Sequence, residues 1–156
     1  MAAIEIIEDN IAQRIIAMPF TRSDAEGKIT ALSEVVTTHI IKIILYRDSP
    51  YCNGWRKEIR TRLYLIEKYG NNFKKGRSLK QGDYRNFLSI FIEPIDSIVA
   101  MTDYVNQSMV GSELKPKRIS PSALHTKMRS LYNSMCELLV TSPSLKDIST
   151  FVSTIK

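Results

Sequence analysis

The sequence predicts an all-α fold, a single-domain bundle of six or seven helices covering residues 1–156. Apolar residues recur every three or four positions in almost every segment, and no segment alternates apolar and polar residues over the length of a strand. Helix-start signals and Pro or Gly residues divide this pattern into separate helices. With 44% apolar residues, a chain of this length can bury a core without disulfides or metals.

The first half of the chain holds three expected helices. Residues 4–18 carry isoleucines on one stripe, and the pattern breaks at Pro19. A capping box, Ser23 with Glu26, opens a second helix that runs to about Tyr46. A third is expected from about Trp55 to Tyr69, with Gly70 as the residue that ends it.

The second half holds the remaining helices. A fourth is expected over residues 81–92, after which Pro94 either kinks it or opens a new helix from Ile95 to about Val110. Ser120-Pro121 has the preferred order of an N-cap followed by Pro at the first helical position. Ser142-Pro143 repeats this signal for a last helix that ends near Ile155.

Basic residues gather in two stretches. Residues 56–85 hold ten basic and three acidic side chains, and residues 115–129 hold five basic and no acidic ones. The stretches 1–55 and 86–114 are acidic, with net charges of −2 and −4, while the whole chain has +6. This alternation predicts either a binding surface or complementarity between regions or copies of the chain.

On a helical wheel, the third expected helix has one apolar arc and a basic flank with a tyrosine in it. The arc expected to be buried consists of Trp55, Ile59, Leu63, Ile66 and Tyr69. Guanidinium and ammonium groups on the flank suit phosphates, and a tyrosine can stack on a base. The candidate nucleic-acid-binding residues of this flank, the following loop and the second stretch are Arg56, Lys57, Arg60, Tyr64, Lys68, Lys74, Lys75, Arg77, Lys80, Lys115, Lys117 and Arg118.

Each of these residues has an alternative interpretation as an ordinary solvent-exposed side chain, because solvated helix faces are rich in Lys and Arg. Glu58 and Glu67 are also placed to form ion pairs within the helix. Arg62 falls inside the apolar arc. One possibility is that the aliphatic part of the side chain runs along the edge of the core. The other is that the guanidinium forms an ion pair with a buried acid, for which Glu34 and Asp96 are the candidates.

The sequence shows no motif that predicts catalysis or a cofactor. His39 and His125 lie in mid-helix beside apolar residues and are expected at the edge of the core. No His, Cys, Asp or Glu cluster has metal-ligand spacing, and no Gly-rich phosphate loop or nucleophile motif is present. We therefore expect no enzymatic activity, no metal and no cofactor.

The expected location is the cytoplasm. Cys52 and Cys136 are expected to be reduced structural thiols. The acidic stretch "MAAIEIIEDN" lacks the features of a signal peptide. The strongest apolar run, "HIIKIILY", is broken by Lys42 and falls short of the ~20 residues of a membrane helix.

The stretch "HIIKIILYRDSPYCNGWRKEIRTR" resembles the bacterial domain-of-unknown-function family twenty-nine, in which a helix with His, two aliphatics and Lys precedes a polar loop and a basic helix opened by Trp. The matching positions are His39, Ile40, Ile41, Lys42, Trp55, Ile59 and Arg62. "SLK" at 78–80 fits the family's next helix start, so the resemblance spans residues 39–80. Ile43 stands where the family usually has Trp, and the loop length differs slightly. The resemblance implies an all-helical bacterial protein and no particular activity.

These observations predict a binding protein. In size, charge and fold class the chain is analogous to the helical small subunits of CRISPR effector complexes. We expect sequence-independent binding of RNA or single-stranded DNA by one small subunit of a larger bacterial or phage nucleoprotein assembly, with other protein subunits as partners and no membrane. The alternative is a protein-interaction module (an inhibitor, an immunity protein or an adaptor) whose basic face docks an acidic partner.

Overall fold

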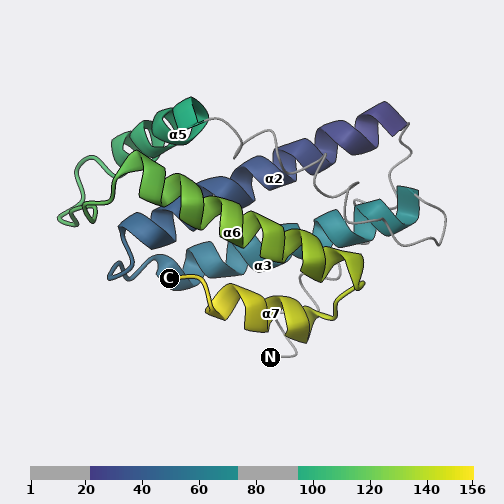
Figure 1. Ribbon diagram of the computed structural model, residues 1–156. Coiled ribbons are helices and arrows are strands. Elements are labelled where there is room, and N and C mark those ends of the chain that lie inside the picture. Colours follow the sequence, from purple (N-terminus) through teal and green to yellow (C-terminus); the bar gives the residue numbers. More distant parts are fainter. Residues whose placement is uncertain (1–21, 74–94) are drawn as a thin grey trace.

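The computed structural model describes residues 22–73 and 95–156, and these two ranges contain helices and turns without a strand. In chain order the helices are α2 (Arg22–Leu45), α3 (Cys52–Phe73), α5 (Ile95–Ser108), α6 (Pro121–Val140) and α7 (Leu145–Ser153) (Figure 1). The prediction of a helical fold is thus confirmed for the described residues. The helices expected over 4–18 and 81–92 lie outside them.

An antiparallel pair, α2 and α3, forms the centre of the arrangement. α5 packs on α2 and on α6, while α7 packs on α3, and in Figure 1 α6 runs across the central pair. One hydrophobic core joins all five helices. Its fully buried side chains include Ile40 of α2, Leu63 of α3, Ile98 of α5, Met128 of α6 and Ile148 of α7.

Helix α3 is buried on more than one side. Residues 63–67 are all buried, including Tyr64 and the acidic Glu67, at 7% and 3% exposure. A helix with one apolar arc contacts its neighbours along one face, but α3 has α2 and α7 packed against it. The helical wheel therefore places Ile59, Leu63 and Ile66 correctly in the core. It underestimates how much of the rest of the α3 surface is buried by neighbouring helices.

Two helix boundaries differ from the sequence expectation in an informative way. α3 begins at Cys52 and continues to Phe73, so Gly70 lies inside the helix and does not end it. The last helix is capped by Ser144, whose hydroxyl accepts from the Asp147 N–H while the Asp147 carboxylate accepts from the Ser144 N–H. Ser142 does not cap this helix. It follows the C-cap of α6 and has a φ of 50°, the left-handed conformation common just after a helix.

Of two other helix starts expected from the sequence, one is observed and one is not. Ser120 accepts a hydrogen bond from the Ala123 N–H and Pro121 opens α6, as the sequence predicts. α2 begins at Arg22, so Ser23 lies within its first turn. Among the described residues, no helix combines the length and apolar content needed to cross a membrane.

Candidate nucleic-acid interface

The α2–α3 turn and the α5–α6 connection meet at one end of the helices (Figure 1). The Lys117 N–H donates a hydrogen bond of 2.8 Å to the carbonyl oxygen of Leu45, the last residue of α2. Nearby, the Tyr46 hydroxyl donates a hydrogen bond of 2.8 Å to Asn106 Oδ1 on α5. Both bonds join segments far apart in the sequence, so they fix the position of the connection against the turn.

Four cationic side chains project from these two segments, and we call them the basic end. They are Arg47, Lys115, Lys117 and Arg118. All four are exposed, and none forms an ion pair with another residue of the ranges 22–73 and 95–156. A shallow pocket of about 30 Å³ between the segments is lined by Arg47, Lys115 and Lys117 among others, which shows that cations from the two segments border the same space.

Two acids accompany the basic end. Asp48 is exposed in the turn and lines the same pocket, and Glu113 is exposed at the start of the connection. The four cations outnumber these two carboxylates, so the end keeps a positive balance. Sequence reasoning identified Lys115, Lys117 and Arg118 and missed Arg47. The available signal for Arg47 was a lone cation in a turn directly after a long apolar helix.

Arg56, a candidate phosphate-binding residue, bonds to the backbone beyond α3. Its guanidinium donates from Nη1 to the Val152 carbonyl at 2.5 Å and from Nη2 to the Ile155 carbonyl at 2.6 Å. Val152 lies in the last turn of α7, and Ile155 follows the C-cap Thr154, so Arg56 binds at the end of the helix where the dipole is negative. The half-buried Arg56 therefore joins α7 to α3 through one N–H of each terminal nitrogen.

The remaining candidates on α3 differ in exposure. Tyr64 is buried in the core and offers no ring face to a base, contrary to expectation. Lys68 lies with Nζ 5.0 Å from the centre of the Tyr64 ring. Arg60 is half-buried and Lys57 is exposed. Lys74, Lys75, Arg77 and Lys80 lie outside the described residues.

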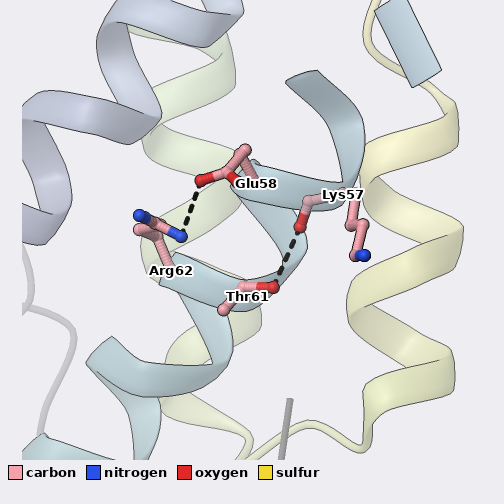
Figure 2. A network of polar contacts seen from close by, with 4 residues as sticks. All are labelled: Lys57, Glu58, Thr61 and Arg62. Atoms are coloured by element: carbon pink, nitrogen blue, oxygen red, sulfur yellow. Dashed lines mark hydrogen bonds and ion pairs between the residues drawn. The ribbon is translucent and has the colours of Figure 1, made fainter. Parts of the chain in front are cut away.

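Arg62 pairs within its own helix. Figure 2 shows the Glu58–Arg62 ion pair, 2.7 Å between Oε2 and Nη1, on the side of α3 that faces α2. Lys57 points the other way, towards α7, and its carbonyl accepts a hydrogen bond of 3.1 Å from the Thr61 hydroxyl. The partner of Arg62 is thus the acid one turn earlier and not the exposed Glu34. Such partly exposed pairs contribute little, about 0.3–0.5 kcal/mol.

His39 on α2 lies close to this pair. Burial, together with the positive charges of Lys42 and Arg62 and against the opposing effect of Glu58, lowers the pKa of His39 from 6.5 to about 4. The buried Nδ1 accepts no hydrogen bond from the described residues. The ring is therefore neutral at neutral pH. This agrees with its expected place at the edge of the core.

Two aromatic rings lie next to the basic end. Tyr51, at the end of the α2–α3 turn, is 61% exposed. Its ring centre is 6.3 Å from that of the half-buried Trp55, with an angle of 37° between the planes. Lys42 Nζ is 5.8 Å from the Trp55 ring. Sequence reasoning treated Tyr51 only as part of a loop.

Both cysteines lie in the core. Cys52 and Cys136 are buried and form no disulfide. Burial raises the pKa of the Cys52 thiol, which opposes the reactive thiolate form. Within the part of the chain that the structure describes, no group of three or more His, Cys, Asp or Glu side chains is placed to hold a metal ion.

No family model matches this chain, and neither a curated protein nor a solved structure matches it. The resemblance drawn over residues 39–80 therefore stays a prediction. The candidate interface rests on the geometry of the chain itself.

Proposed function

We propose that the chain binds nucleic acid through the basic end, without catalysing a reaction on it, as one subunit of a larger nucleoprotein assembly. The observation that supports this most directly is the joining of two cationic segments by the Lys117–Leu45 hydrogen bond. The four cations are exposed side chains, a position from which a ligand can be contacted.

Binding at such a surface follows from phosphate neutralisation. Each Lys or Arg that contacts a phosphate releases condensed counterions, and the observed affinity then falls linearly with salt on logarithmic axes, with a slope of about −0.7 per contact for single strands. Contacts of this kind carry no sequence information, so the binding is independent of sequence. Arg47 and Arg118 add the forked geometry that suits phosphate oxygens.

The test is fluorescence anisotropy with labelled RNA and single-stranded DNA over a salt series. The wild type is compared with the double variant Arg47→Glu/Lys117→Glu, which reverses two charges of the basic end. Its matched control is Arg129→Glu/Lys146→Glu. That control changes one exposed Arg and one exposed Lys, on α6 and α7 away from the basic end, and gives the same net charge.

We expect the wild type to bind with a salt-dependent affinity. The basic-end variant should lose both affinity and salt slope, and the control should retain most of each. Equal losses in the two variants would mean that net charge alone governs binding, which contradicts a defined interface.

An acidic protein partner is the competing outcome of this experiment. One possible result is that nucleic acid does not bind even at low salt, whereas an acidic polypeptide such as polyglutamate does. If the Arg47→Glu/Lys117→Glu variant then no longer binds the polypeptide, the basic end is a protein-docking surface. In a protein interface, substitution of one or two residues should cause most of the loss of affinity. At a phosphate-binding surface, each single substitution should lower the affinity by a similar amount.

A further inference from the structure

Tyr51 is an exposed aromatic side chain next to the basic end. It shares the α2–α3 turn with Arg47, and 61% of its surface is exposed. Ser49, two residues earlier, lines the pocket that Lys115 and Lys117 also border. Since two residues span at most about 7 Å, Tyr51 lies within a short reach of that pocket.

The backbone and ring of Tyr51 are held in place. Its N–H donates to Ser49 Oγ at 3.0 Å, and its carbonyl accepts from the Trp55 N–H at 3.1 Å, which joins the turn to the first turn of α3. The Trp55 ring lies beside the Tyr51 ring at 6.3 Å between ring centres, with the two planes tilted by 37°. An aromatic group ordered in advance loses little entropy when a ligand stacks on it.

An exposed ring beside phosphate-binding cations favours single-stranded nucleic acid. Proteins that bind single strands combine a cationic path for the backbone with aromatic side chains on which bases stack. In a duplex the base faces are covered by neighbouring base pairs, so a side chain on the surface reaches only groove edges and phosphates. Lys42, with Nζ 5.8 Å from the centre of the Trp55 ring, adds a further positive charge near this ring pair.

We infer that Tyr51 is a stacking platform for an unpaired base, and that it makes the basic end select single-stranded nucleic acid over duplex. This inference rests on the proposed function, since the basic end must hold the strand whose base reaches Tyr51.

The experiment compares three ligands: oligothymidine, an abasic strand of equal length with the same phosphates, and a duplex of that length. The wild type should bind oligothymidine on the order of tenfold more tightly than the abasic strand or the duplex. Tyr51→Ala should remove this preference, and Tyr51→Phe should keep it because the ring remains. Tyr104→Ala is the matched control, because Tyr104 is equally exposed, at 64%, and lies outside the α2–α3 turn.

A second measurement reports from the site itself. Trp55 is the only tryptophan of the chain and contacts Tyr51, so its fluorescence needs no label. Unlabelled oligothymidine should change the emission of the wild type, and the abasic strand should leave it unchanged.

The outcomes separate the two proposals. Salt-dependent binding that is equal for oligothymidine and the abasic strand, and is lost in Arg47→Glu/Lys117→Glu, overturns the stacking role and leaves the proposed function standing. Tyr51→Ala weakening both strands equally also overturns the stacking role, because the loss then does not depend on a base. If the wild type binds none of the three ligands, both proposals fail.

Discussion

The Arg56 guanidinium donates a hydrogen bond of 2.6 Å to the Ile155 carbonyl, ninety-nine positions further along the chain. With the second bond, to the Val152 carbonyl, it neutralises the negative end of α7. One cation of the basic stretch thus holds α7 against α3. Reversing its charge would therefore disturb the fold as well as any binding surface.

Arg56→Ala should lower the free energy of unfolding by about 2 kcal/mol, the usual value of hydrogen bonds made by a charged group when their partners are left behind. Arg56→Lys should recover part of this, because one ammonium cannot reproduce the two-pronged contact. Urea denaturation measures both. The neighbouring Lys57→Ala is the control, since Lys57 is exposed and should change stability by less than about 0.5 kcal/mol. Equal stabilities for the Arg56→Ala and Lys57→Ala variants would contradict the role of Arg56.

His39 should make stability depend on pH. Its pKa in the folded chain is about 4, below the ordinary 6.5, so between these values the unfolded chain binds more protons. The contribution of neutral His39 is therefore complete above about pH 6.5 and is lost as the pH falls towards 4. The protonated ring would be poorly hydrated and close to Lys42 and Arg62.

The measurement for His39 is the free energy of unfolding between pH 7.5 and 4.5 for the wild type and His39→Gln. Hydrogen bonds with Ser144 lower the pKa of Asp147 from 3.8, so this carboxylate titrates below the range and stays ionised in both proteins. We expect the wild type to lose more stability than the variant on acidification. Parallel pH curves for the two proteins would show that His39 titrates normally.

Ser142 adopts a backbone conformation that suits glycine. It has a φ of 50° directly after the C-cap of α6, and its N–H donates to the Leu139 carbonyl. A Cβ disfavours this conformation by roughly 1–2 kcal/mol, while glycine loses more entropy on folding. Ser142→Gly should therefore stabilise the chain by about 0.5 kcal/mol in thermal unfolding. Ser134→Gly, an exposed change inside α6, should destabilise it instead. Loss of stability in both variants would contradict this account.

A local signal in the sequence located the start of α6, because capping involves only neighbouring residues. Ser120 caps α6 as expected. The Ser-Pro pair at 142–143 gave a wrong prediction of the cap of α7. Ser142 follows the end of α6 in a left-handed conformation, and Ser144 is the residue that caps α7. Nothing in the two-residue signal distinguishes these cases. The difference lies in where the preceding helix ends.

The candidate site was less predictable, since it depends on contacts between distant segments. Charge density pointed to Arg56 and Tyr64, but one is bonded to α7 and the other is buried where α3 has neighbours on two sides. A helical wheel predicts neither the contact with α7 nor the burial by a second neighbour. Arg47 and Tyr51 were passed over because a turn of mixed composition has no periodicity to interpret, although their exposure makes them the more accessible side chains.

The hydrogen bond from Lys117 to Leu45 should determine whether the basic end holds together. Lys117→Ala removes the charge and keeps the N–H donor, whereas Lys117→Pro removes both. Since the donor satisfies the carbonyl at the end of α2, the proline variant should lose about 1 kcal/mol more stability than the alanine variant in urea denaturation. It should also bind single-stranded nucleic acid more weakly at equal net charge, because the connection carrying Lys115 and Arg118 would no longer be fixed against the turn carrying Arg47. The stability comparison needs no ligand, so it stands apart from the proposed function. If the two variants unfold at the same urea concentration, the bond does not hold the segments together, and the arrangement of the four cations needs another cause.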